Sequence, residues 1–429
     1  MRRRTTSSLL VVSIALLSFL FSDITLAGGA WLTETGGADM AMAAAGSAAL
    51  AADASTLAAN PAGMVELQGN RLLITAMPLL LEIQGSGDGD TTGSINNQGG
   101  PTPAGALFAT HSNGRWAAGL GLYSYLGLGF DYGRQWSGAR AVQSADFVTI
   151  NIAPAFAYRL NKRVSLGGSL SAQYASAQAK LAVANNLPLY GSPADSPDGQ
   201  LRLEGDSWAL GGGSLGATYT HSASTRFGLA WTAPVSHHIE LDLHGSNLRP
   251  EVAALLQQVG SAGLDMKLPQ QYRLSAVHSL SADTLLAGSI ALQQWSEFGE
   301  AQLRVGNAST PMFGDGLRDT WGVAIGLRHQ IDPRWSVSGG IGYDSSPVKK
   351  GRAPVYFPVS DQLRMALGAD YRYSDTLVLR SALSVVSQGE VRIGQESYPV
   401  QLPGMPTVTG KIADSRIYLG AISVDYRFQ

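Results

Sequence analysis

Alternating apolar and polar residues run through most of this chain and constrain its fold more than any other feature. Between residues 335 and 343, the odd positions carry Trp, Val, Gly, Ile and Tyr, and the even positions carry only Ser and Gly. Residues 422–428 alternate in the same way. Successive side chains of a strand point to opposite faces, and strands of about ten residues cross a membrane as part of a barrel. Residues 71–429 are therefore predicted to form an all-β, antiparallel transmembrane barrel.

The lengths of the connections predict the topology of this barrel. Short turns alternate with long connections. The short turns lie at residues 112–114, 160–163, 221–224, 281–283, 332–334 and 374–376, and the long connections lie near residues 83–102, 127–143, 179–204, 239–267, 295–317, 345–360 and 389–413. Together they join 14 strands and leave both chain ends on the side of the short turns. Short turns on one rim and long loops on the other are typical of outer-membrane barrels, whereas a soluble sandwich gives no reason for this separation.

The first residues predict export. Residues 1–27 have three arginines, a short apolar core at residues 9–20 and small residues before Gly28, as a cleaved secretory signal peptide does. No later stretch supplies the roughly 20 apolar residues of a spanning helix. Charged residues make up 14% of the chain, below the about 25% usual in soluble domains. A net charge of -2 argues against a nucleic-acid partner, and the absence of cysteine excludes disulfides. We expect the outer membrane of a Gram-negative bacterium as the location.

An alanine-rich segment precedes the first strand. Of the 25 residues from Ala38 to Ala62, 13 are alanine, which favours helix and packs closely. A barrel of this size leaves an open lumen unless something fills it. Residues 28–70 are therefore predicted to be a small helical hatch, or plug, inside the lumen of the barrel formed by residues 71–429. The alternative is an ordinary helical hairpin beside a soluble sheet.

Short motifs, spread in order along the chain, resemble the FadL family of outer-membrane transporters, which also includes aromatic-hydrocarbon channels. Asn60, Pro61, Ala62 and Gly63 resemble the hatch motif of that family, and further matches lie at residues 157–161, 268–269, 295–298, 344–348 and 358–364. The resemblance implies that the long loops collect hydrophobic ligand, which enters the lumen. It also implies that the hatch then moves and that the ligand leaves sideways through a kink in the third strand.

Glycines mark the predicted position of this lateral exit. Gly119, Gly121, Gly127 and Gly129 lie in the third strand, residues 115–130. Glycine weakens a strand and permits a bulge or a gap. The alternative is that these glycines only fill a crowded wall, since the chain has 51 of them.

The fourth long connection contains a predicted helix that begins at Pro250. Val252, Leu255, Leu256 and Val259 recur with the spacing of one helix face. Such an apolar face in an external loop is a candidate surface for collecting a hydrophobic ligand. It would otherwise pack against neighbouring loops.

The sequence thus predicts a passive transporter for hydrophobic compounds, with long-chain fatty acids favoured. Alternatives are an uptake channel for aromatic hydrocarbons, a general porin, or an outer-membrane lipid hydrolase that would depend on Ser214. We expect no enzyme, no cofactor and no metal site. The expected partners are hydrophobic small molecules, outer-membrane lipid and, during biogenesis, the barrel-assembly machinery, with the protein a monomer.

Overall fold

The computed structural model describes residues 34–88, 92–186, 196–314, 316–348, 353–394 and 408–428. The predicted signal peptide and its cleavage point lie outside the described residues. Within the described residues, no helix is both long and apolar enough to span a bilayer.

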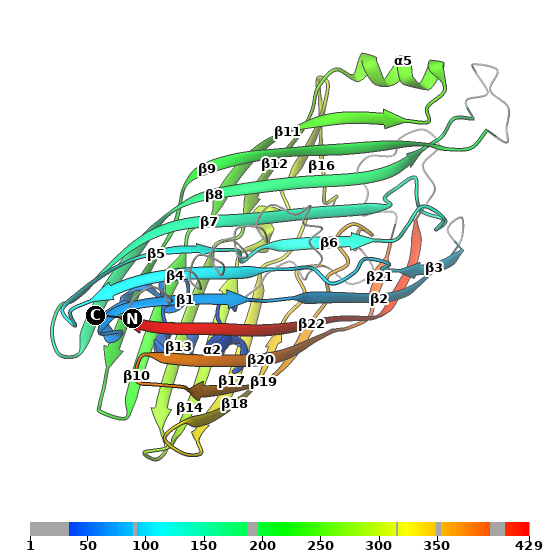
Figure 1. Ribbon diagram of the computed structural model, residues 1–429. Coiled ribbons are helices and arrows are strands. Elements are labelled where there is room, and N and C mark those ends of the chain that lie inside the picture. Colours follow the sequence, from blue (N-terminus) through cyan, green and yellow to red (C-terminus); the bar gives the residue numbers. More distant parts are fainter. Residues whose placement is uncertain are drawn as a thin grey trace, which may run out of the picture.

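Antiparallel strands form one closed barrel of 14 wall strands (Figure 1). Some wall strands consist of two labelled segments. In chain order they are β1 (Gly69–Ala76) with β2 (Leu79–Asp88), β3 (Gly93–Asn96) with β4 (Gly105–Ser112), β5 (Trp116–Tyr123) with β6 (Gly127–Asp131), β7 (Ser144–Arg159), β8 (Val164–Val183), β9 (Gly199–Thr220), β10 (Thr225–Thr232) with β11 (Val235–Ser246), β12 (Ala262–Leu268) with β13 (Gln271–Ser279), β14 (Thr284–Gln293) with β15 (Gln302–Val305), β16 (Ala308–Pro311) with β17 (Thr320–Gln330), β18 (Trp335–Asp344), β19 (Gln362–Arg372), β20 (Leu377–Gln388) with β21 (Val391–Ile393), and β22 (Thr409–Phe428). The last strand, β22, pairs with both β1 and β20 and so closes the barrel.

The six predicted short turns all connect neighbouring wall strands, and the predicted barrel with short turns on one rim is confirmed. The connection predicted near residues 345–360 matches the gap between β18 and β19, whereas most of the predicted long connections were too wide. For example, the connection expected at residues 179–204 spans only residues 184–198, because β8 and β9 remain paired up to Val183 and Gly199.

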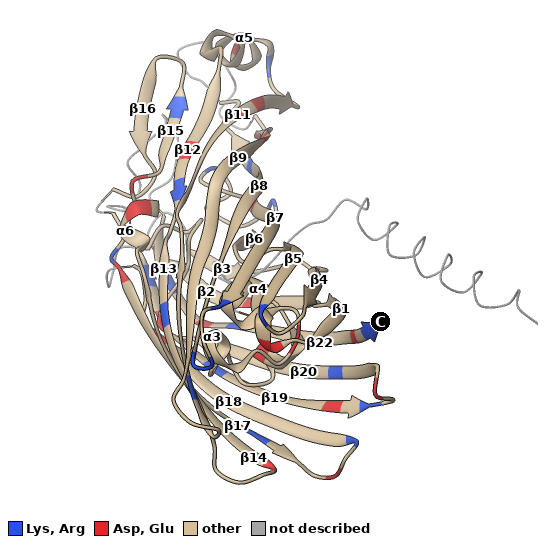
Figure 2. Ribbon diagram, turned by 90° about the vertical axis from the view of Figure 1, so that its left-hand side faces the viewer, with Lys and Arg blue, Asp and Glu red and all other residues tan. Residues whose placement is uncertain are grey.

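The outer face of the wall is apolar. Leu170, Leu210, Leu367 and Leu383 are each more than 70% exposed, as expected where lipid rather than water surrounds the strands. Aromatic pairs such as Tyr174–Trp208 mark one edge of this face, and Trp335–Tyr371 marks the other. In Figure 2, charged residues colour mainly the turns, the far ends of strands and the surroundings of the N-terminal segment.

The N-terminal segment, residues 34–68, lies inside the lumen. It contains α2 (Gly37–Met40), α3 (Ser47–Leu50), α4 (Thr56–Ala59) and the 3₁₀ helix η1 (Pro61–Glu66). These elements contact strands around the barrel: α2 packs on β19, β20 and β22, α3 on β9, β10, β13 and β14, and η1 on β4, β5, β7, β8 and β9. The segment is less helical than its alanine content predicts, because Ala43, Ala44 and Ala51 adopt positive φ angles between short helical turns.

Two helices lie at the opposite, loop-rich end. The helix α5 (Pro250–Val259) begins and ends where the sequence predicts, and it stands out from the rim in Figure 1. The shorter α6 (Trp295–Phe298) lies between β14 and β15.

Candidate functional site

Asn60 ties the N-terminal segment to the wall. Its side chain is fully buried, and its Oδ1 accepts a hydrogen bond from the amide of Ala62 at 3.1 Å. Its Nδ2 donates to the carbonyl of Ala48 in α3 at 2.7 Å and to the carbonyl of Ala217 in β9 at 3.1 Å. One amide side chain therefore joins two parts of the segment to the barrel.

The other members of the predicted hatch motif are buried beside it. Pro61 occupies the first position of η1, where a missing N–H costs nothing. Ala62 is fully buried, and a Cβ on Gly63 would lie 2.4 Å from the hydroxyl of Thr56. The structure thus brings the four motif residues together at the wall. Their action as a moving hatch stays a prediction.

Glycines of the wall make room for the segment. A Cβ on Gly216 would lie 1.8 Å from Oδ1 of Asn60, and one on Gly228 would lie 1.9 Å from the carbonyl of Ala48. Any larger side chain at these positions would push the segment out of place. Part of the glycine content of the chain therefore reflects close packing between the wall and an alanine-rich segment.

Buried charges also hold the segment. Arg380 of β20 lies 3.6 Å from the carboxylate of Asp53, and Arg364 of β19 lies 2.9 Å from that of Glu34. Burial, together with the nearby charge of Asp53, raises the pKa of Asp39 in α2 to about 8. Separating a buried ion pair costs about 3–5 kcal/mol, because it leaves an uncompensated charge.

An apolar cavity of about 400 Å³ lies in the loop-side half of the barrel. Its lining includes residues of β6, β7, β8, β9, β11, β12, β15, β16, α5 and α6 and of the connections after β6, β16 and β18. Of the predicted α5 face, Leu256 and Val259 line this cavity, Val252 is buried, and Leu255 is exposed. The structure therefore brings half of that predicted face to the cavity.

Aromatic side chains close one side of the cavity. Phe298 of α6 has its ring centre 5.6 Å from that of Phe313 and 5.8 Å from that of Phe357, and Trp295 packs on both Phe298 and Phe357. Ring contacts at these distances stabilise one another beyond their burial alone. Residues of α6 and of the connections after β16 and β18 thus form one apolar wall.

A break interrupts the third wall strand at residues 124–126, between β5 and β6. The pairing of β5 with β4 reaches Leu122, and β6 pairs with β7. Among the backbone hydrogen bonds between described residues, none joins residues 124–130 to the preceding wall strand. Leu126, inside this strand break, lines the apolar cavity.

The predicted exit glycines flank the strand break rather than form it. Gly119 and Gly121 face the lumen within β5, where an added Cβ would lie 2.8 Å and 3.1 Å from the side chain of Leu57. Gly127 and Gly129 lie in β6. The first two glycines therefore accommodate the N-terminal segment, and the last two lie beside the gap in pairing.

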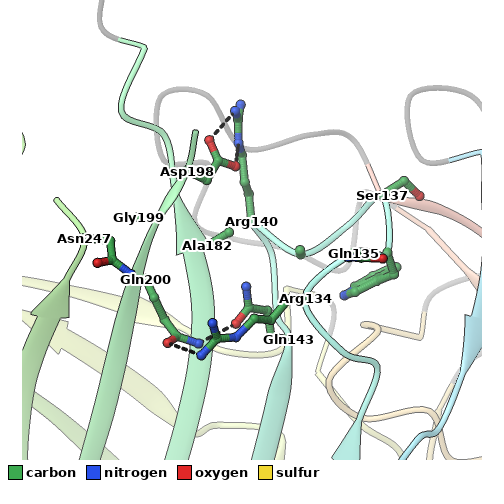
Figure 3. A pocket seen from close by; sticks show the side chains of 12 residues that line it. Arg134, Gln135, Ser137, Arg140, Gln143, Ala182, Asp198, Gly199, Gln200 and Asn247 are labelled. Carbon is green, nitrogen blue, oxygen red and sulfur yellow. Dashed lines mark hydrogen bonds and ion pairs between the residues drawn. The ribbon is translucent and has the colours of Figure 1, made fainter. Parts of the chain in front are cut away.

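A polar pocket of about 700 Å³ lies among the connection after β6 and the loop-side ends of β8 and β9 (Figure 3). Arg140 pairs with Asp198 through two contacts of 2.7 Å, whereas Arg134 donates to Oε1 of Gln200 at 3.1 Å. Nε2 of Gln200 donates in turn to Oε1 of Gln143 at 2.8 Å, which fixes the amide that Arg134 contacts. The segment 139–143 contributes residues both to this pocket and to the cavity.

Several cavity residues had no role assigned from the sequence. Leu126 and Phe147 belong to strands whose pattern shows only alternation. A usable signal exists in the connections, where pairs of large apolar residues interrupt otherwise polar loops: Trp295 with Phe298, Met312 with Phe313, and Tyr356 with Phe357.

Known proteins resemble this chain over nearly its whole length. A profile of the outer membrane protein transport family (OMPP1/FadL/TodX) matches residues 18–428. The long-chain fatty acid transport protein of Escherichia coli O6:H1 is 26% identical over 399 residues, which cover 86% of this chain and 88% of that protein.

Solved structures share the fold. The crystal structure of a Pseudomonas aeruginosa FadL homologue superposes with a TM-score of 0.81 at 21% identity, covering 94% of this chain and all of that one (100%). The Ralstonia pickettii toluene transporter TbuX superposes with a TM-score of 0.65 at 18% identity, covering 93% of this chain and 99% of that one.

A closed transmembrane barrel with an apolar cavity defines the class of outer-membrane transporters for hydrophobic compounds, which are not enzymes. Within that class, the chain belongs to the outer membrane protein transport family, OMPP1/FadL/TodX. The predicted family resemblance and the outer-membrane location are confirmed.

Proposed function

We propose that this protein takes up long-chain fatty acids by a passive route across the outer membrane. The observation that carries the proposal is the apolar cavity of about 400 Å³, which has aromatic and aliphatic walls and reaches a break in the barrel wall at Leu126. Its size falls within the about 300–1,000 Å³ typical of small-molecule sites. Each methylene that moves from water into such a cavity contributes about 0.8 kcal/mol.

The proposed path runs from the loops into the cavity and out through the strand break. Leu256 and Val259 of α5 extend the apolar lining towards the loops, where ligand is collected. The ligand then passes between β6 and the preceding wall strand into the bilayer. The N-terminal segment closes the aqueous path through the lumen during this transfer. Monomeric insertion into outer-membrane lipid by the barrel-assembly machinery belongs to the same proposal.

The hatch movement in this route is a local rearrangement. Asn60 and the buried pairs Arg380–Asp53 and Arg364–Glu34 anchor the N-terminal segment on different wall strands. Breaking several buried ion pairs, at about 3–5 kcal/mol each, makes release of the whole segment costly. A lateral path that leaves the lumen above the segment does not require release.

Arg134 supports fatty acids over uncharged hydrocarbons. Among the described residues, its guanidinium bonds the amide of Gln200 and no carboxylate. A guanidinium binds a carboxylate through two parallel hydrogen bonds, so the polar pocket at the loop-side ends of β8 and β9 suits the head of a fatty acid. The Escherichia coli and Salmonella typhi relatives that are named long-chain fatty acid transport proteins agree with this choice.

Uptake of aromatic hydrocarbons is the second candidate. The rings of Trp295, Phe298, Phe313 and Phe357 form one wall of the cavity, and aromatic faces pack well on aromatic ligands. The toluene transporters among the structural neighbours share the fold.

Labelled uptake separates the two candidates. Cells that lack their own transporter would express the wild-type chain or Arg134→Gln at equal surface amounts, with Arg334→Gln in a short turn as the matched control. We expect wild-type uptake of oleate, and a half-saturating oleate concentration about tenfold higher in Arg134→Gln, as loss of about 1.4 kcal/mol requires. Toluene uptake without oleate uptake would replace the fatty-acid proposal by the aromatic one. Free passage of small sugars without either uptake would indicate a porin.

A further inference from the structure

A chain of hydrogen bonds runs along the inner face of the wall beside the strand break, across neighbouring strands. Nε2 of Gln173 on β8 donates to the hydroxyl of Tyr125 at 3.1 Å and to Oδ1 of Asn151 at 2.8 Å. Oε1 of Gln173 faces Nε2 of His237 on β11 at 2.9 Å, and Nδ1 of His237 faces the hydroxyl of Ser207 on β9 at 2.8 Å. Tyr125 lies inside the strand break, and Asn151 lies on β7, so this chain connects the break to four further wall strands.

The network lies between the N-terminal segment and the apolar cavity. On β8, Gly167 faces Ala62 of the segment, Gln173 follows, and Ala177 lines the cavity. On β11, His237 is followed by Leu241, which also lines the cavity. The network therefore forms a polar layer beneath an apolar cavity.

Gln173 uses all of its side-chain groups within this layer. Both N–H groups of its amide donate, so its Oε1 is the acceptor that fixes Nε2 of His237 as a donor. Nδ1 of His237 then accepts the proton of the Ser207 hydroxyl. Gln173, Asn151 and His237 are each no more than 1% exposed. A fully satisfied buried network of this kind holds a single conformation.

Hydrogen bonds from β7 hold the backbone of the strand break. The carbonyl of Leu126 accepts hydrogen bonds from the amide and the hydroxyl of Thr149 on β7, at 3.1 Å and 3.0 Å. On the side of the preceding wall strand, backbone pairing is missing at residues 124–130 among the described residues. The bond from Gln173 to Tyr125 thus anchors, from the lumen side, a segment that has no backbone pairing with the preceding wall strand among the described residues.

We propose that Tyr125, Gln173 and His237 form a latch that keeps the strand break closed. His237 orients the amide of Gln173, and Gln173 holds the tyrosine hydroxyl inside the lumen. Breaking the Tyr125–Gln173 bond lets residues 124–131 move away from β8 and opens the wall beside Leu126. These three are positioning residues. Their effect on transport rests on the lateral route proposed above, whereas their effect on the break does not.

Hydrogen exchange of the purified full chain in phospholipid nanodiscs tests the latch directly. Tyr125→Phe keeps the ring, which lies 6.1 Å from that of Tyr123, and removes only the hydroxyl. We expect amides at residues 124–131 to exchange about tenfold faster, while β13 and β14 keep their wild-type protection, because local openings report local stability. Tyr123→Phe is the matched control, because it removes the neighbouring hydroxyl and leaves the latch in place.

A second variant tests whether the two side chains act as one unit. Gln173→Met has a similar length and no amide. Because it also removes the bonds to Asn151 and His237, it should raise exchange at residues 124–131 at least as much as Tyr125→Phe does. The double variant Tyr125→Phe/Gln173→Met should exchange no faster than Gln173→Met alone, because the Tyr125–Gln173 bond is already absent there. Unchanged exchange in Tyr125→Phe, an equal increase in Tyr123→Phe, or additive effects in the double variant would each overturn the latch.

Oleate uptake separates the latch from the lateral route. With an open break, Tyr125→Phe should raise the maximal rate of oleate uptake and leave the half-saturating concentration unchanged. If Tyr125→Phe exchanges faster at the strand break but takes up oleate at the wild-type rate, the latch is supported and the lateral route of the proposed function is contradicted.

Discussion

Replacing Asn60 by alanine should loosen the N-terminal segment without unfolding the barrel. The substitution removes an acceptor for the amide of Ala62 and a donor to the carbonyl of Ala48, both within the buried segment. Each buried group left without its partner costs about 1–3 kcal/mol, so the segment should lose about 3 kcal/mol of local stability. That loss corresponds to an increase of about 100-fold in the population of locally open states.

Hydrogen exchange of the full chain in nanodiscs measures this change. We expect the amides of α3 and η1 to exchange about 100-fold faster in Asn60→Ala, whereas the amides of β18 and β19 keep their wild-type protection. Asn70→Ala, which removes an amide contact to His111 at the end of β1, is the matched control and should leave α3 and η1 unchanged. Exchange within about twofold of the wild type in Asn60→Ala would refute the anchoring role of this side chain.

Three further predictions concern the packing of the segment, the cavity and a buried carboxyl group. Gly228→Ala should displace α3 and raise ion conductance in planar bilayers, because its Cβ would lie 1.9 Å from a carbonyl of α3, whereas Gly288→Ala, with 3.6 Å of room, should not. Phe298→Ala should weaken oleate binding in calorimetry about tenfold, or about 1.4 kcal/mol, and Phe156→Ala on the lipid face should leave it unchanged. Because the pKa of Asp39 is raised from 3.8 to about 8, the folded chain binds this proton more tightly than the unfolded chain does, so the free energy of unfolding should fall between pH 4 and 8. Asp39→Asn should remove this part of the pH dependence in denaturant titrations, and an unchanged slope would contradict it.

The barrel could be predicted from the sequence because lipid imposes a simple pattern. Each wall strand must place apolar residues outwards, and the resulting period of two is visible without any knowledge of pairing. Turn residues such as Asn113, Asn161 and Asp332 mark the short rim, where their side chains accept hydrogen bonds from following amides. The strand ends on the other rim were harder to predict, since pairing there extends into water and the outward apolar pattern ends.

The conformation of the N-terminal segment could not be predicted from helix propensity. The small size of its alanines matters more than their helix propensity, because the wall lies very close to the segment at Gly216 and Gly228. Backbone groups that a regular helix would satisfy are satisfied by the wall: the hydroxyl of Ser289 accepts from Gly46, and that of Ser275 accepts from Ala48. Tertiary contacts therefore override local preference.

The candidate site could be predicted only in part, because tertiary contacts rather than local patterns bring most of its residues together. The face of α5 is a local pattern, so it could be found, and Leu256 and Val259 do reach the cavity. Leu126 and Phe298 come from distant parts of the chain, and no local pattern indicates that they share a cavity. For Gly119 and Gly121 the local pattern was visible but its meaning was not. The sequence suggested that these glycines weaken the strand, whereas in the structure they leave space for the side chain of Leu57.

The most direct test of the account is oleate uptake by a chain with a charge placed in the cavity. Leu241 of β11 lines the cavity, and His244 of the same strand is exposed. Cells that lack their own transporter would express the wild-type chain, Leu241→Glu or His244→Glu at equal surface amounts. The account predicts that Leu241→Glu loses most oleate uptake, because an unpaired carboxylate among the apolar side chains of the cavity draws water into the path, and that His244→Glu retains it. Equal uptake by all three chains would contradict transport through this cavity.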